Sequence, residues 1–178
     1  MNKLEIKQFQ HELLLALKKD FEQVEIPIAL RDAREENLPM DILTSLHLNY
    51  GHGQHEVMGE YYFFPMPEED VPAHYFSTML NLENEIRQDC LPQLREAVCA
   101  LNFYIQCGSF VVNPTGTLLG FRFITPIPVD FKFEQALQLM NLNVGHSLEL
   151  AEHHVDDLIR VAQGKLSLKD FMFQMPDV

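Results

Sequence analysis

Residues 102–128 read NFYIQCGSFVVNPTGTLLGFRFITPIP, and this stretch decides the fold. Two runs rich in β-branched and aromatic residues, 102–112 and 118–128, flank the tetrapeptide NPTG. Proline at the second turn position and glycine at the fourth favour a type I turn that ends in a left-handed residue. The stretch therefore predicts an antiparallel β-hairpin.

A second hairpin is predicted upstream of the first. Residues 41–50 and 55–65 form two strand-like runs, and the glycines at positions 51 and 53 supply the positive φ angles that a tight loop needs. Before this hairpin, residues 24–30 alternate between apolar and polar side chains, which predicts a leading strand.

Three helical segments are expected around these strands. In residues 3–21 an apolar residue recurs at every fourth position, and residues 73–101 and 131–163 carry similar stripes. Gly145 either continues the last helix or divides it in two. The predicted element order is α-β-ββ-α-ββ-α. It belongs to the α+β class, with an antiparallel sheet of about five strands, a leading strand and two hairpins, packed by helices in one domain, 1–178.

The charge balance limits the classes of partner that the chain is expected to bind. Twenty-six acidic groups against 13 basic ones give a net charge of −13, and residues 40–102 contain ten acidic residues but two arginines. Such a surface repels nucleic acid and anionic lipid, so we expect no nucleic-acid binding and a preference for basic partners.

Compartment and membrane association can also be predicted. The apolar run near the N-terminus, 13–17, is too short for a signal peptide, and no run reaches the 18 residues that a membrane span requires. The three cysteines contain no CxxC pair, which is typical of free thiols in a reducing compartment. We therefore expect a cytoplasmic protein that does not enter a membrane.

The segment LHLNYGHGQHEVMGEYYFF, 46–64, raises the question of a metal site. It contains His47, His52 and His55, and imidazole is a common zinc ligand. No HExxH or CxxC motif accompanies them, and the glycines do not form a phosphate-binding GxGxxG loop. The segment mainly predicts a turn, with His52 and His55 as alternative metal ligands.

A further set of polar residues lies on the last long helix. Glu149, His153 and Asp157 share one helix face, because they are four residues apart. A solvated helix surface is the plain interpretation, and His153 and Asp157 are kept as alternative metal ligands. No GxSxG motif or readable Ser-His-Asp set is present, so we predict no catalytic residues and no cofactor.

The C-terminal sequence DFMFQMPDV, 170–178, is unusually rich in phenylalanine and methionine. Phe171, Phe173 and Met175 either dock onto the core or contact a subunit or client protein. In the upstream hairpin, 41–65, Tyr61 and Phe63 are the other predicted partner-binding residues.

The second half of the chain resembles a known family. LREAVCALNFYIQCGSFVVNPTGTLLGFRFITPIP (94–128) ends a helix in a Leu-Asn step and continues into the hairpin, and VDDLIRVAQGKLSLKDF (155–171) closes a helix with a Gly-x-Leu-Ser step. This cadence resembles the bacterial sensory-transduction regulators that share the type III secretion chaperone-like fold. The resemblance implies a small acidic α+β protein, often dimeric, that binds other proteins through its sheet or helices, and it implies no catalytic residue.

These features together favour a non-enzymatic protein-interaction module with secretion-chaperone-like architecture. Its partner would be a client protein or a second copy in a homodimer. The alternative is a metal- or small-molecule-binding protein, or an enzyme, that uses His52, His55, His153 or Asp157.

Overall fold

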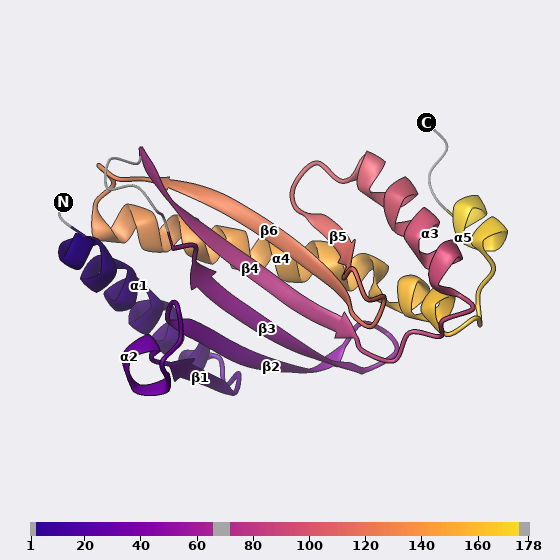
Figure 1. Ribbon diagram of the computed structural model, residues 1–178, viewed down its shortest axis with the longest axis horizontal. Helices are drawn as coiled ribbons and strands as arrows, with labels where there is room; N and C mark the ends of the chain where they lie inside the picture. The colour runs from indigo at the N-terminus through magenta and orange to yellow at the C-terminus, as the bar shows by residue number, and fades with distance from the viewer. Residues whose placement is uncertain (1–2, 66–71, 175–178) are drawn as a thin grey trace. The chain divides into compact units, whose positions relative to one another are not determined.

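The computed structural model describes residues 3–65 and 72–174 (Figure 1). Within these residues six strands form one antiparallel sheet in the order β1-β2-β3-β4-β6-β5. The strands are β1 (Ile28–Arg31), β2 (Ile42–Tyr50), β3 (His55–Phe63), β4 (Ala73–Glu83), β5 (Ser109–Val112) and β6 (Leu119–Pro128). The helices are α1 (Lys3–Gln23), α2 (Ala33–Glu36), α3 (Leu91–Tyr104), α4 (Phe133–Ala162) and α5 (Leu168–Gln174).

The predicted α+β class and both predicted hairpins are confirmed, but the strand predicted over 102–112 is shorter, because α3 continues to Tyr104 and β5 begins at Ser109. In the hairpin around the NPTG turn, Phe110 of β5 pairs with Phe121 of β6. Its turn closes through a 2.9 Å hydrogen bond from Gly116 N to Asn113 O, and Gly116 has a φ of +69°. The side chain of Asn113 also accepts from the backbone of Thr117 at 2.8 Å, which fixes the start of the return strand.

One predicted helix is wrong over its first half. Residues 73–83 form the strand β4, and helix begins at Leu91 with α3. β4 lies inside the sheet between β3 and β6. Its buried residues include the neighbours Phe76, Ser77 and Thr78, which point to opposite faces, while Tyr75 and Met79 stay partly exposed. A strand buried on both faces loses the simple alternation of apolar and polar residues that identifies a strand at the surface of a sheet.

The last long helix is continuous, and one short helix lies where no helix was predicted. α4 continues through Gly145 for 30 residues, so the glycine does not divide it. The charged segment after β1 contains the short helix α2, whose N-cap is Asp32. None of the described helices combines the length and apolar composition needed to cross a lipid bilayer.

The chain forms two compact units. The first consists of Met1–His47, Met58–Met79 and Ile124–His146, and the second consists of Leu48–Val57, Leu80–Phe123 and Ser147–Val178. β2, β3, β4, β6 and α4 each contribute residues to both units. Each unit has its own set of buried side chains.

In the first unit α1 packs against β1 (Figure 1) and buries the predicted stripe through Leu13, Leu17 and Phe21. The ring of Phe21 lies 5.2 Å from that of Tyr61 on β3. The N-terminal part of α4 meets the same sheet face, where Asn143 accepts a 2.6 Å hydrogen bond from Thr78. Both helices therefore cover one face of this part of the sheet.

The second unit is built around α3, α5 and the hairpin of β5 and β6 (Figure 1). Phe110 and Phe121 pack edge to face with ring centroids 5.0 Å apart, a favourable geometry for aromatic pairs. The C-terminal part of α4 adds a stripe of fully buried residues: Ala151, Val155, Leu158, Val161 and Ala162. This core holds the elements on which most of the predicted metal ligands and tail contacts lie.

Candidate functional site

The first candidate site is the sheet face of the first unit that lies opposite α1 and α4. Side chains alternate between the two faces of a strand, so the neighbours of buried residues point away from the helices. We define the outer face as six apolar residues at these alternate positions of β2, of β3 and the residue that follows it, and of β4: Leu46, Met58, Tyr62, Phe64, Tyr75 and Met79. Of the described outward positions of these three strands in the first unit, Glu60 carries a charge and the others are uncharged.

The outer face combines exposure with aromatic character. Leu46 and Met58 are 38% and 42% exposed, and the other four residues are partly exposed. The rings of Tyr62 and Phe64 pack edge to face at 5.2 Å. An apolar, aromatic surface with little charge is the composition found at the centre of protein–protein interfaces.

The inner face of the same strands holds Tyr61 and Phe63, the predicted partner-binding residues of the upstream hairpin. Both are buried, at 0% and 3% exposure. The hydroxyl of Tyr61 lies 3.0 Å from Ser45 Oγ and 3.1 Å from His47 Nε2. Burial raises the pKa of Tyr61 and lowers that of His47, so both side chains are neutral in the core. Tyr61 and Phe63 thus belong to the core, and their neighbours Tyr62 and Phe64 lie on the outer face.

The second candidate site is a pocket of about 560 Å³ in the first unit. It lies among α1, α2 and the segment that leads into β2, and its polar lining includes His11, Asp32, Asp41, Lys7 and Arg34. His11 Nδ1 and Asp41 Oδ2 are 2.8 Å apart, and these side chains are 33% and 20% exposed. The pair is therefore partly sheltered and still open to solvent.

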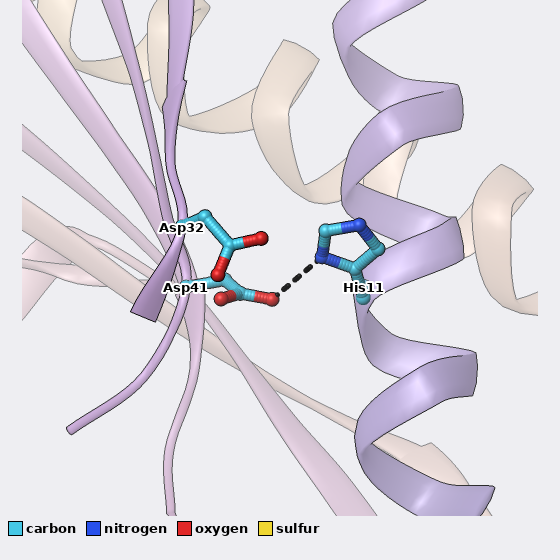
Figure 2. Close-up of side chains that lie close together, drawn as sticks. All are labelled: His11, Asp32 and Asp41. Carbon is cyan, nitrogen blue, oxygen red and sulfur yellow. Dashed lines mark hydrogen bonds and ion pairs between the residues drawn. The ribbon is translucent and has the colours of Figure 1, made fainter. Parts of the chain in front are cut away.

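The backbone of α2 positions both carboxylates of this pocket. Asp41 Oδ1 accepts a 2.8 Å hydrogen bond from Ala33 N, and Asp32 Oδ1 accepts one of 2.7 Å from Arg34 N. Figure 2 shows His11 projecting from α1 toward the two aspartates. In the described part of the chain, His11, Asp32 and Asp41 are the group whose ligand atoms, all within 4.8 Å of one another, could hold a metal ion.

Sequence reasoning missed this pocket. His11, Asp32 and Asp41 come from a helix, a helix N-cap and the approach to a strand, so no fixed spacing connects them. One local signal was readable, because Asp32 followed three residues later by Glu35 is the pattern of a capped helix start. That pattern predicts α2, which brings the two carboxylates together.

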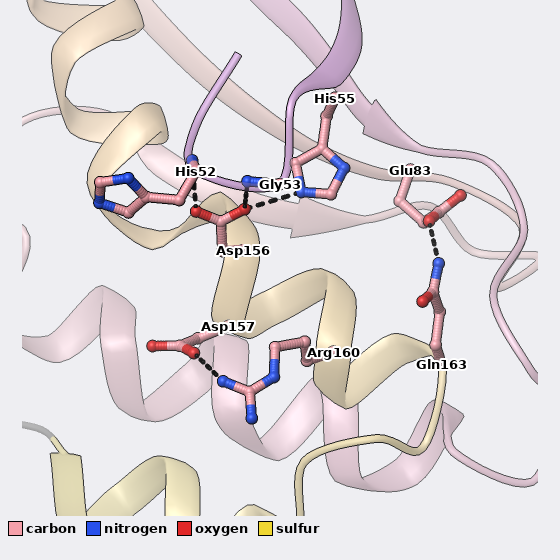
Figure 3. Close-up of polar contacts among 8 residues, drawn as sticks. All are labelled: His52, Gly53, His55, Glu83, Asp156, Asp157, Arg160 and Gln163. Atoms are coloured by element: carbon pink, nitrogen blue, oxygen red, sulfur yellow. Dashed lines mark hydrogen bonds and ion pairs between the residues drawn. The ribbon is translucent and has the colours of Figure 1, made fainter. Parts of the chain in front are cut away.

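The predicted turn at 51–54 is confirmed, and a residue distant in sequence holds it. Asp156 of α4 accepts hydrogen bonds from the backbone N–H groups of His52 and Gly53, at 2.9 and 2.7 Å, and pairs with His55 Nε2 at 2.8 Å (Figure 3). Desolvation acts to raise the pKa of Asp156, but the hydrogen bonds outweigh it and lower the pKa.

The alternative metal ligands do not form a common cluster. His55 is paired with Asp156, and His52 contributes its backbone N–H to the same carboxylate. His153 Nδ1 contacts the carbonyl of Glu149 at 2.9 Å, while Asp157 pairs with Arg160 at 3.1 Å (Figure 3). Among the residues that the structure describes, these four do not supply a three-ligand group.

The predicted tail contacts lie in different environments. Phe171 is 4% exposed in the core of the second unit, whereas Phe173 is 90% exposed on α5. Met175 lies outside the described residues. Phe103 at the end of α3 is also 80% exposed. Of the two predicted tail residues that the structure describes, Phe173 is therefore the exposed one.

No protein-family model matches the chain, and no curated protein matches its sequence. The resemblance to the regulators with a secretion chaperone-like fold stays a prediction based on residues 94–171.

Proposed function

We propose that this chain is a non-enzymatic protein-interaction module with chaperone-like architecture, and that it binds its partner through the outer face. The observation that supports this proposal best is the outer face itself. Six apolar side chains lie on adjacent strands there, with Glu60 as the charged neighbour. Strands of a sheet also present such residues on a rigid support, so binding costs little conformational entropy.

The partner is a client protein whose apolar contact surface is bordered by basic residues. The outer face supplies apolar contact area, with Tyr62, Phe64 and Tyr75 as the aromatic anchors typical of binding hot spots. The net charge of −13 supplies attraction for a basic partner and speeds the encounter.

The same charge disfavours a second copy as the occupant. Two chains of −13 each repel one another, and repulsion between like charges lowers the rate and affinity of association. The homodimer is therefore the outcome that the experiment must separate from a client complex.

The test compares two charge-matched double variants. Leu46→Asp/Met58→Asp places two acidic groups on the outer face, and Val24→Asp/Leu142→Asp places two at apolar positions of the first unit outside it. Val24 and Leu142 are 64% and 51% exposed, so all four substitutions replace surface side chains. Each protein is used as bait in a lysate of its native cells, and the retained proteins are identified by mass spectrometry and then purified for titration.

The proposal expects one partner that the wild type and the Val24/Leu142 variant retain and the outer-face variant loses. Its affinity for the wild type should fall as salt is added. Light scattering tests the homodimer. If the wild type is a dimer and the outer-face variant is a monomer, the occupant of the outer face is a second copy and not a client. The wild type and both double variants could retain a partner that the variant Phe173→Asp loses. That result would place the binding surface on α5 and not on the outer face. Equal retention by all four proteins would refute the outer face.

A further inference from the structure

We propose that His11, Asp32 and Asp41 form a binding site for a divalent transition-metal ion, with zinc as the ion used to test it. The site lies in the pocket of the first unit, on side chains outside the outer face. The inference goes beyond the proposed interaction function, because it assigns a ligand class to residues that the interaction does not use.

The spacing of the ligand atoms fits one ion. Zinc binds imidazole nitrogen and carboxylate oxygen at about 2.0–2.2 Å, so two tetrahedral ligands lie about 3.4 Å apart. His11 Nδ1 and Asp41 Oδ2 are 2.8 Å apart, and all three ligand atoms lie within 4.8 Å of one another. Small side-chain rotations therefore bring all three atoms to bonding distance around one ion.

The two carboxylates are already oriented for this role. One oxygen of Asp41 accepts from Ala33 N, and one oxygen of Asp32 accepts from Arg34 N, at 2.8 and 2.7 Å. The second oxygen of Asp41 faces His11 Nδ1 at 2.8 Å, a contact that a bound ion would replace with two metal–ligand bonds. Hydrogen bonds that fix ligating carboxylates in this way are a general property of metal sites and raise their affinity.

The charge and the donor set select the class of ion. Two carboxylate ligands beside an imidazole bring negative charge close together, and a divalent cation relieves the repulsion between the carboxylates. Imidazole nitrogen favours zinc and similar transition metals over calcium or magnesium, which prefer all-oxygen sites. Because the pocket of about 560 Å³ is open, water can complete the coordination.

The second unit provides a natural comparison. His55 Nε2 and Asp156 Oδ1 are also 2.8 Å apart, with similar exposures of 24% and 26%. Both oxygens of Asp156 are engaged by the turn, and no third ligand of a metal-binding group accompanies the pair in the described residues. If a His-Asp pair alone sufficed, both pairs would bind zinc equally.

The experiment titrates zinc into the full chain by calorimetry. Exposed Cys99 and Cys107 also attract zinc, so every protein carries Cys99→Ser/Cys107→Ser. His11→Gln and Asp32→Asn each remove one ligand, and asparagine still caps α2. His55→Gln is the matched control. Thermal unfolding without zinc shows that each variant folds.

The proposal expects one zinc ion per chain and a rise in the unfolding temperature when zinc is added. His11→Gln and Asp32→Asn should each weaken binding at least about tenfold, because even the supporting residues of metal sites have effects of this size. His55→Gln should leave the affinity unchanged. The proposal is overturned if zinc does not bind, if the ligand variants bind it as well as the parent, or if His55→Gln is the variant that loses it.

Discussion

Replacing Asp156 by alanine should destabilise the second unit more than any other single change on the exposed side of α4. The carboxylate accepts hydrogen bonds from His52 N, Gly53 N and His55 Nε2, at 2.9, 2.7 and 2.8 Å. These bonds fasten the turn between β2 and β3 to a helix about a hundred residues away in sequence. Asp156→Ala removes all three acceptors at once.

The magnitude follows from the number of bonds and their exposure. A hydrogen bond to a charged group contributes about 1.5–3 kcal/mol when it is sheltered from water. The side chain of Asp156 is 26% exposed and the turn residues His52 and Gly53 are exposed, so water replaces part of each lost bond. About 1 kcal/mol for each bond is then appropriate, and the expected loss is about 2–3 kcal/mol.

The neighbouring residue gives a matched control. Asp157 pairs with Arg160 at 3.1 Å, and these side chains are 37% and 49% exposed. Exposed ion pairs of this kind contribute about 0–1 kcal/mol, so Asp157→Ala should change the free energy of unfolding by less than Asp156→Ala. Urea denaturation at pH 7, followed by circular dichroism, measures both variants.

The pH dependence provides a second measurement. The pKa of Asp156 is lower in the folded chain than its usual value of 3.8. Its contribution is therefore fully present above that value and is lost as the pH falls through the folded pKa. The difference between the wild type and Asp156→Ala should shrink below pH 3.8. Equal losses for the Asp156 and Asp157 variants, or an Asp156 effect that persists in acid, would refute this account of the turn.

Two further predictions concern buried polar groups of the first unit. Asn143→Ala should lower the free energy of unfolding by about 3 kcal/mol in chemical denaturation, because Thr78 and Thr125 lose buried partners at 2.6 Å. Ser77→Ala should change it very little, since Ser77 Oγ is buried without a hydrogen-bond partner among the described residues. A larger loss for the serine variant would contradict this. Burial lowers the pKa of His74, so protonation favours the unfolded chain as the pH falls below 6.5. His74→Phe should therefore gain stability relative to the wild type by up to about 1.4 kcal/mol per pH unit below 6.5, and a gain that is constant with pH would contradict the reasoning.

The parts of the fold that were predictable from the sequence are those that local chemistry decides. The NPTG turn needs its proline and glycine in place, and Gly116 does adopt a φ of +69°. The first helix follows from an apolar stripe whose members Leu13, Leu17 and Phe21 are all buried. In both cases the residues that give the signal also make the interaction.

β4 could not be predicted in the same way. Phe76 and Leu80 are four residues apart, and residues four apart lie on the same face of both a helix and a strand. The choice between them is made by position in the sheet, because β4 lies between β3 and β6 and pairs with a strand at each of its edges. Position in a sheet depends on strand pairing, which the local pattern does not contain.

The metal-binding group was hidden for a related reason. His11, Asp32 and Asp41 become neighbours because α1 packs against β1 and α2 follows that strand directly. The predicted alternative ligands His52 and His55 are close in sequence, but the carboxylate that both contact is Asp156, in the other half of the chain. Proximity in sequence therefore indicated a turn, while the candidate site depends on tertiary packing.

In the aromatic run YYFF at 61–64, the register of the strand determines which side chains enter the core and which lie on the candidate interface. All four side chains are aromatic, so the run gives no sign of which alternate pair faces inward. Burial of Tyr61 against Phe21, together with its hydrogen-bonding contacts to Ser45 and His47, favours the odd positions for the core. A strand alternates strictly, so Tyr62 and Phe64 must then point the other way. The polar groups buried beneath the sheet thus determine which aromatic residues are presented on the outer face, where the proposed partner binds.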